Sequence, residues 1–213
     1  MSVSRRSYAH YCPVARTLDV IGERWALLIV RELALGSRRY TDLHADLPGI
    51  STDVLAARLK DMEANGLVTR RRLSVPVWVY ELTPRGHELV PVLAGLASWG
   101  SALLSEADPT DALRGHWFAI PLATALRQAA GSATGTVRVL LDEHDWSLRI
   151  GPGGVTFTGE DTEPDATVRL DTATAAALAR RDTRLSDAVA HGEVTVKGDS
   201  ALSWALGTTN SVR

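Results

Sequence analysis

The chain has very little cysteine and no long hydrophobic run. Cys12 is the only cysteine among 213 residues, which excludes both an intramolecular disulfide and a cysteine-rich metal site. No apolar stretch approaches the roughly 18 residues of a membrane-spanning helix. The N-terminal segment also lacks the apolar core of a secretory signal. We therefore expect no membrane partner and a cytoplasmic location.

Signatures of catalysis are also missing. The sequence contains no nucleophile elbow, phosphate-binding loop or dinucleotide-binding glycine pattern. Its six histidines are scattered without metal-ligand spacing. The glycine-rich residues 151–154 and the polar residues 142–145 each lie between two strand-like runs, which favours turns over a phosphate site or a catalytic site. We expect no enzyme activity, no cofactor and no metal.

Neither sign of charge dominates. The chain has 23 Lys and Arg against 25 Asp and Glu, a net charge of −2. Residues 1–108 hold 13 basic against 12 acidic residues (+1), and residues 109–213 hold 10 against 13 (−3). Affinity for DNA would therefore have to come from local clusters such as Arg38-Arg39 and Arg70 to Arg72.

Residues 50–72 contain the most informative stretch. Ser51 is a good helix N-cap, and Leu55, Leu59 and Met62 recur at i, i+4 and i+7 as one apolar stripe. Asn65-Gly66 is typical of a helix end. The opposite face carries small and polar side chains, namely Asp53, Ala57, Lys60 and Asp61. Such a face is either solvated or presented to base edges in a major groove.

The neighbouring segments favour the DNA-binding interpretation. A short helix at 39–47, a Pro-Gly turn and the helix after Ser51 form a helix-turn-helix pattern. Strands at 67–73 and 77–82 then predict a hairpin wing, and two further helices are predicted upstream, at 13–21 and 23–35. The sequence thus predicts an N-terminal winged helix, mainly α with a β-hairpin wing.

A long helix is predicted from Pro84 to Glu106, with a kink at Pro91. Its broad apolar face consists of Leu89, Val92, Leu93, Leu96, Trp99 and Leu103. A small winged domain cannot cover that face, so we expect a partner helix from a second subunit. The alternative is packing against its own core or the following domain.

The composition changes after Ala107, so we predict domains at 1–107 and 108–213. The second contains helical segments at 110–130 (interrupted near Pro121), 173–180, 185–191 and 200–206, and strands at 136–141, 146–150, 155–158, 167–170 and 194–197. This pattern predicts an α+β domain with a mainly antiparallel sheet.

The N-terminal half resembles the HxlR family of bacterial transcriptional regulators. The likeness rests on the Cys-Pro start, the Gly22 to Trp25 corner, the LPGIS run at 47–51, Gly66-Leu67-Val68 and Leu82-Thr83-Pro84. It implies a winged-helix homodimer, joined through the N-terminal segment and the 84–106 helix, on a pseudo-palindromic operator in double-stranded DNA. Val75-Pro76-Val77-Trp78 departs from the more polar wings of the family.

The DNA hypothesis assigns a role to each candidate residue. Thr52, Asp53, Ala57 and Lys60 are placed near base edges, and Ser51 at a phosphate beside the helix N-terminus. Arg38, Arg39, Arg70, Arg71 and Arg72 are candidate phosphate or minor-groove contacts. Arg58, on the shoulder of the leucine stripe, could reach DNA or make an internal ion pair.

Residues 110–207 resemble the sterol-carrier-protein type-two fold, which implies an apolar tunnel for a small hydrophobic ligand. The candidate lining residues are Trp117, Phe118, Leu126, Trp146 and Phe157. The alternative is that these side chains fill a solid core, or that the domain only reinforces the dimer. A protein of this kind could also be a lipid carrier whose winged half docks onto another protein.

Cys12 allows a different kind of regulation. In the family that the N-terminal half resembles, a cysteine at this Cys-Pro position serves some members as a sensor of oxidants or electrophiles. The alternative, which we favour because the second domain is suited to ligands, is a small buried hydrophobic residue without a sensing role.

Overall fold

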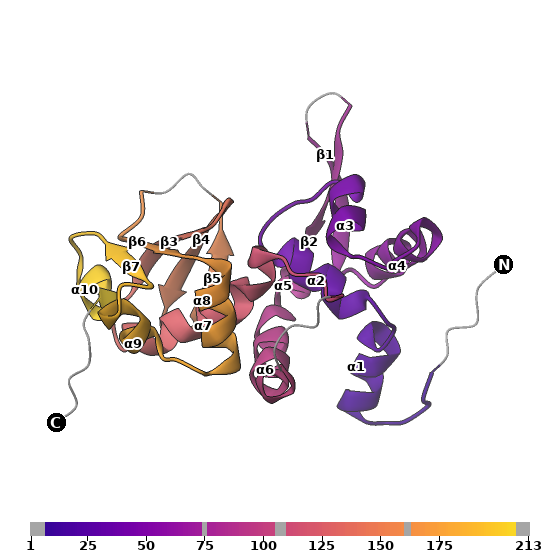
Figure 1. Ribbon diagram of the computed structural model, residues 1–213. Coiled ribbons are helices and arrows are strands. Elements are labelled where there is room, and N and C mark those ends of the chain that lie inside the picture. The colour runs from indigo at the N-terminus through magenta and orange to yellow at the C-terminus, as the bar shows by residue number, and fades with distance from the viewer. Residues whose placement is uncertain (1–6, 74–75, 105–109, 160–162, 208–213) are drawn as a thin grey trace. The chain divides into compact units, whose positions relative to one another are not determined.

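The computed structural model describes residues 7–73, 76–104, 110–159 and 163–207. They form two compact units, Met1–Val90 and Pro91–Arg213, which are described separately below (Figure 1). The division falls at the start of helix α6 (Val90–Gly100). The boundary predicted at 107/108 lies outside the described residues.

The first unit is a winged helix, as predicted. Its elements are α1 (Pro13–Ile21), α2 (Ala26–Ala34), α3 (Tyr40–Asp46), α4 (Thr52–Ala64), β1 (Val68–Arg72), β2 (Trp78–Leu82) and α5 (Pro84–His87). The core is made by the apolar sides of these elements, with Ile29, Leu43 and Leu55 completely buried. Each predicted helix and strand up to residue 82 is present, with ends that differ by at most three residues.

The sequence explains both ends of α4. The Ser51 hydroxyl oxygen accepts a hydrogen bond from the Val54 backbone N–H at 3.3 Å, which satisfies an amide of the first turn. At the other end Gly66 has φ +68°, a left-handed conformation that glycine adopts without steric cost. Leu55, Leu59 and Met62 are buried, so the predicted stripe faces the core.

The wing is joined to the helix-turn-helix by a third piece of chain. β1 and β2 pair antiparallel from Val68↔Leu82 to Arg72↔Trp78. On the other side of β2, the Arg38 N–H donates to the Tyr80 carbonyl at 2.9 Å and the Tyr80 N–H donates to the Arg38 carbonyl at 2.8 Å. The residues that lead into α3 therefore extend the two-stranded sheet.

The long helix predicted at 84–106 is wrong in one respect, because the described part of it is broken. α5 ends at His87, α6 runs from Val90 to Gly100, and the 3₁₀ helix η1 covers Ser101–Leu103. Pro91 has no N–H and its ring would clash with the carbonyl of the preceding turn in a continuous helix. In the first turn of α6, where amides have no helical partner, a proline is tolerated.

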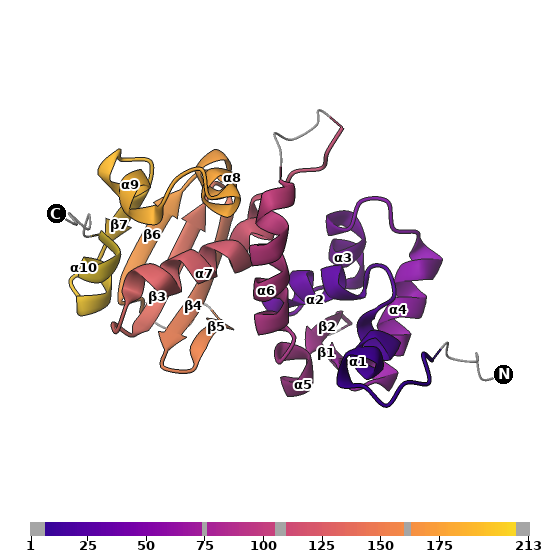
Figure 2. The same cartoon turned by 90° about the horizontal axis from the view of Figure 1, so that it is seen from below.

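The second unit contains the rest of α6 and an α+β domain. Its further elements are η2 (Gly115–Phe118), α7 (Ala119–Ala130), β3 (Gly135–Leu141), β4 (His144–Gly151), β5 (Gly154–Thr158), β6 (Ala166–Leu170), α8 (Thr172–Arg180), α9 (Leu185–Ala190), β7 (Thr195–Lys197) and α10 (Ala201–Gly207). The strand order is β5-β4-β3-β6-β7, and β3-β6 is the parallel pair in an otherwise antiparallel sheet. α7 crosses the sheet and contacts β4 and β5 (Figure 2). The predicted fold class is confirmed.

Two details of this unit were open in the sequence. Residues 151–154 form the tight turn between β4 and β5, as expected. Residues 142–143 form the turn between β3 and β4, and the Asp142 carboxylate accepts hydrogen bonds from the backbone and hydroxyl of Thr172 at 3.0 and 2.5 Å. Pro121 lies within the first turn of α7, so the predicted interruption comes earlier, where η2 meets α7.

No helix in the described ranges is long and apolar enough to cross a membrane.

Gly86 provides a test of how tightly α5 packs on the wing. A Cβ at this position would lie 2.1 Å from the Leu67 carbonyl oxygen, which is backbone and cannot move aside. We expect Gly86→Ala to lower the free energy of unfolding by about 1–3 kcal/mol. In Gly95→Ala, where nothing lies within 4 Å of the new Cβ, stability should be unchanged or raised by about 0.5–1 kcal/mol. Denaturant unfolding of the full chain measures both, and equal effects would contradict the tight packing.

Candidate functional site

The face of α4 that points away from the core is open to solvent. Thr52, Asp53, Ala57 and Lys60, the predicted base-edge residues, are all exposed on it. The helix is held at its N-terminal end by the Tyr40 hydroxyl, which donates to the Thr52 carbonyl at 2.7 Å. This end of α4 is fixed to α3. A helix that reads DNA requires such support, because the two helices of a helix-turn-helix dock as one body.

Sequence reasoning missed Val54 on the same helix. Its side chain is 39% exposed although valine is usually buried. Exposed aliphatic groups on such a helix can contact the methyl group of thymine. The periodicity did hold a signal, because Val54 falls outside the stripe formed by Leu55, Leu59 and Met62.

The exposed charges of α4 are mostly acidic. Asp53, Asp61 and Glu63 are opposed by Lys60. Carboxylates repel phosphates but can accept a hydrogen bond from the amino group of cytosine. Attraction to the DNA backbone must therefore come from residues outside this helix.

Two of the predicted arginines are brought together by the wing. Arg38 and Arg70 pair with Tyr80 from opposite sides, so the three residues form one strip across the sheet. Adjacent strands lie about 4.8 Å apart, which places the two arginine backbones roughly 10 Å from each other. The Arg70 guanidinium lies 4.5 Å from the ring centre of Trp78, a cation–π contact that holds it on the wing.

Three predicted arginines have acidic partners within the first unit. Arg71 Nε donates to Glu81 at 2.9 Å, and Arg38 lies 3.9 Å from Asp46. Arg58 lies 3.2 Å from Asp61 and 3.8 Å from Glu23, so the internal ion pair that the sequence left open is formed. The guanidinium groups of Arg39 and Arg72 have no hydrogen-bond or ion-pair partner among the described residues.

Tyr80 lies in the middle of this basic strip. Burial raises the pKa of its hydroxyl above the ordinary value of a tyrosine, and the positive charge of Arg70 partly opposes that rise. The hydroxyl is therefore protonated near neutral pH and adds no negative charge beside Arg38 and Arg70.

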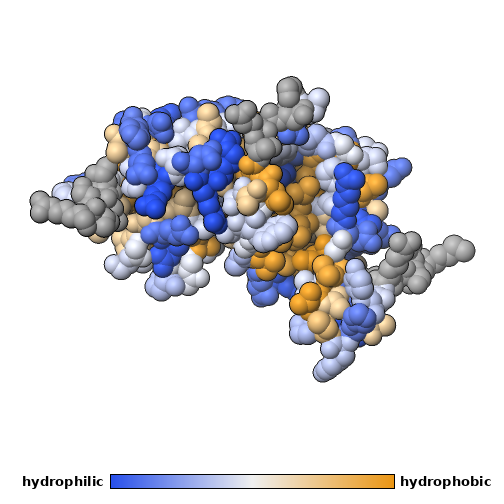
Figure 3. Space-filling view, turned by 60° about the horizontal axis from the view of Figure 1, so that its bottom comes forward, coloured by the Kyte–Doolittle hydropathy of each residue, from blue (hydrophilic) through white to orange (hydrophobic). Residues whose placement is uncertain are grey.

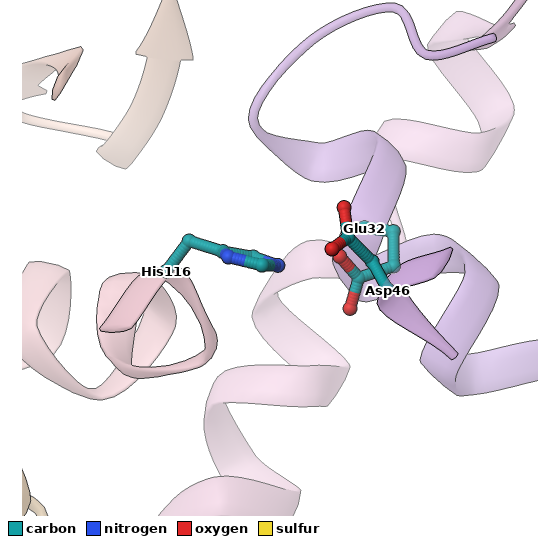
Figure 4. A group of neighbouring side chains, drawn as sticks. All are labelled: Glu32, Asp46 and His116. Carbon is teal, nitrogen blue, oxygen red and sulfur yellow. The ribbon is translucent and has the colours of Figure 1, made fainter. Parts of the chain in front are cut away.

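Two carboxylates of the first unit come close together. Glu32 of α2 is completely buried, and one of its oxygens lies within 4.8 Å of an oxygen of Asp46 (Figure 4). The Arg31 guanidinium donates to Glu32 at 2.6 and 2.9 Å, and Arg38 lies near Asp46. Because each carboxylate has an arginine of its own unit nearby, we interpret them as structural ion pairs. His116, also drawn in Figure 4, belongs to the second unit.

A cavity of about 880 Å³ opens within the second unit. Its walls come from α6, α7, α8, α9 and α10 and the residues between α8 and α9. Part of the wall is alanine, for example Ala94, Ala97, Ala125 and Ala179, with leucines at the C-terminal elements. The rest includes polar side chains, among them Ser98, Thr124, Gln128 and Ser186. Its volume lies within the range of about 300–1,000 Å³ typical of small-molecule sites.

The predicted lining residues lie elsewhere in the second unit. None of Trp117, Phe118, Leu126, Trp146 and Phe157 lines this cavity. Leu126 and Trp146 are buried in the core of the sheet domain. Large side chains fill space, whereas runs of alanine leave it open, so the sequence signal for this cavity was the small residues and not the aromatic ones.

Cys12 is a free thiol and is exposed in the described chain. It occupies the N-cap position of α1, where its side chain makes no capping hydrogen bond. The interpretation of Cys12 as a small buried residue is therefore wrong for the single subunit, because α1 lies at the surface with its N-terminus facing solvent.

The comparisons with known proteins agree with this geometry. Residues 20–108 match the HxlR-like helix-turn-helix family. The chain is 38% identical over 99 residues to the HTH-type transcriptional regulator sll1512 of Synechocystis, spanning 46% of this chain and 73% of that protein. It is also 38% identical over 93 residues to YvaP of Bacillus subtilis, spanning 42% and 86%.

The chain belongs to the HxlR family of helix-turn-helix transcriptional regulators. Among solved structures, it is similar to the transcriptional regulator YodB of B. subtilis in its reduced form, at 32% identity. That likeness covers 46% of this chain and all of YodB, with a TM-score of 0.40. In this HxlR-family regulator, the exposed face of α4 and the arginine-bearing wing form the candidate DNA interface.

The second unit of the HxlR-family regulator matches a different family. Residues 119–209 match the SCP-2 sterol transfer family, as the predicted resemblance anticipated. The cavity draws part of its wall from α6, which precedes that match and lies in the HxlR-like region.

The wing arginines allow a test of the DNA interface. Each arginine that touches a phosphate contributes about one unit to the slope of log K against log salt concentration. We expect Arg72→Ala to reduce that slope by about one, and Arg71→Ala to reduce it less because Glu81 already pairs with Arg71. Fluorescence anisotropy with a labelled DNA duplex measures the slope.

The matched control is Arg149→Ala, which removes an exposed arginine from β4 of the second unit. An unchanged slope and affinity in both Arg70→Ala and Arg72→Ala would remove the wing from the interface.

Proposed function

We propose that this regulator binds a pseudo-palindromic operator as a homodimer and that a small hydrophobic molecule in the second unit modulates the binding. The observation that carries the proposal is the open face of α4 beside a wing with exposed arginines. We also propose that the protein is not an enzyme, and that it acts in the cytoplasm, where its DNA is.

Two exposed apolar surfaces support the dimer. On α6, Val92, Leu96 and Trp99 are 46%, 45% and 73% exposed. In the N-terminal segment, Tyr11, Val14 and Leu18 are exposed as well. Figure 3 shows hydrophobic residues gathered at the surface of these elements. Exposed apolar groups in clusters mark association surfaces in soluble proteins.

The operator geometry follows from the symmetry of such a dimer. Two α4 helices related by a two-fold axis reach successive major grooves when they lie about 34–36 Å apart, one turn of DNA. Asp53, Ala57, Lys60 and Val54 would then read the same bases in each half-site. The arginines Arg38, Arg39, Arg70 and Arg72 would contact the flanking phosphates.

Trp99 tests the dimer surface. We expect Trp99→Glu to place a charge in the interface and to weaken dimerisation by about 2 kcal/mol or more. Operator affinity should fall with it, because half-sites bound by single subunits lose their coupling. Sedimentation velocity measures dimerisation. Operator affinity is measured on genomic DNA fragments that the wild-type protein retains.

Trp204→Glu is the matched control, since Trp204 of α10 is 65% exposed and lies on neither apolar surface. Equal effects of the two variants would contradict the assignment of α6. Failure of the wild-type chain to retain any DNA would instead favour a lipid carrier with a protein-docking module.

A thiol switch is the second candidate function, and the exposure of Cys12 favours it. The cysteine precedes Val14 and Leu18 on α1, so a modification or an intersubunit disulfide there would act on the dimer surface. Thiol reactivity requires access, which Cys12 has in the single subunit.

Oxidation of the purified protein tests this candidate. If Cys12 senses oxidants, hydrogen peroxide should abolish DNA binding by the wild type, dithiothreitol should restore it, and Cys12→Ser should retain binding throughout. An oxidant response that persists in Cys12→Ser would exclude the switch. Mass spectrometry of non-reduced protein distinguishes a disulfide from other products.

A further inference from the structure

The charged side chains that the described residues place in the wall of the cavity are all basic. They are Arg181 and Arg184, and no Asp or Glu of the described ranges lines it. Among the described residues, the Arg184 side chain has no hydrogen bond or ion pair, and Arg181 bonds to Ser98, which is neutral. The nearby carboxylate of Asp182 is paired with Arg180 at 2.7 Å. Two arginines thus line the cavity, and within the described ranges no carboxylate is paired with either.

We propose that the cavity binds an amphipathic carboxylate, a molecule with one carboxylate on an apolar body. This inference rests on the proposed effector role of the second unit and names the chemical class of the effector. Arg181 and Arg184 would hold the carboxylate, since guanidinium groups form short, charge-assisted hydrogen bonds with it. The apolar body would lie against Ala125, Ala179 and Leu185, which form part of the wall.

Helix α6 connects this site to the dimer surface. Ala94, Ala97, Ser98 and Ser101 line the cavity. At about 100° per residue they lie on one side of the helix, and Val92, Leu96 and Trp99 lie on the opposite side. One face of α6 therefore contacts the ligand while the other face is the proposed contact with the second subunit.

The ligand and helix α6 compete for the guanidinium group of Arg181. Its Nη2 donates to the Ser98 carbonyl at 3.2 Å and to the Ser98 hydroxyl oxygen at 2.6 Å, tying the end of α8 to α6. Arg181 has φ +65°, a strained conformation for a residue with a side chain. A ligand carboxylate would accept hydrogen bonds from the same guanidinium, and the bonds between Arg181 and Ser98 would break. Ligand binding therefore loosens α6 and weakens both dimerisation and operator binding.

Calorimetric titration of the full chain with dodecanoate tests the ligand class. Dodecanol and dodecyltrimethylammonium have the same chain with a neutral and a cationic head group. We expect dodecanoate to bind at least about tenfold more tightly than dodecanol, and the cation not to bind. Equal affinity for dodecanoate and dodecanol would overturn the proposal.

Arginine variants locate the carboxylate. Arg184→Gln and Arg181→Gln should each weaken dodecanoate about tenfold and leave dodecanol unchanged, because only the charge contact is lost. Arg149→Gln, on β4 and outside the cavity, should change neither affinity. Unchanged dodecanoate affinity in both Arg181→Gln and Arg184→Gln would overturn the assignment of the two arginines.

Sedimentation and operator binding with and without dodecanoate test the coupling. The expected result is an increase of about tenfold in the dimer dissociation constant and a loss of operator affinity. Bound dodecanoate with both quantities unchanged would overturn the role of α6. If the ligand-free protein neither dimerises nor binds DNA, the proposed function fails. The calorimetric comparison of dodecanoate with dodecanol still tests the ligand class independently.

Discussion

Burial of one apolar stripe fixes the orientation of everything else in the DNA-binding unit. Leu55, Leu59 and Met62 are at most 2% exposed, and each buried side chain of this size contributes about 1.5–3 kcal/mol. A rotation of α4 that exposed the stripe would therefore cost several kcal/mol. The same burial keeps Asp53, Ala57 and Lys60 on the outside. In the proposed DNA interface, the side chains that α4 offers to bases are thus selected by residues that point into the core.

Local patterns in the sequence were sufficient for most helices and strands of both units. Ser51 and Gly66 marked the ends of α4 because capping depends on residues within one turn of the helix end. Pro91 showed where the following helix was weak, but its position alone did not distinguish a kink from the break between His87 and Val90. That outcome depends on the tertiary packing of α5, where Gly86 lies against Leu67.

The ion-pair partners of side chains and the position of the cavity could not be predicted from local patterns. Arg71 and Arg72 are equivalent in the sequence, yet only Arg71 finds Glu81, since cross-strand partners depend on the register of β1 and β2. Aromatic residues were expected to enclose the ligand site, whereas the cavity is lined by alanines from several helices. A space between elements depends on how those elements meet, and no periodicity within one segment reports that.

The strip formed by Arg38, Tyr80 and Arg70 has a consequence for evolution and engineering. Because the residue that leads into α3 pairs with β2, the wing and the helix-turn-helix share hydrogen bonds and are not independent modules. Transplanting the hairpin from another member of the family would leave the Arg38 backbone facing a foreign strand. A functional chimera would have to exchange residues 37–39 together with 67–82, so these two separate segments are expected to change in concert when operator preference diverges.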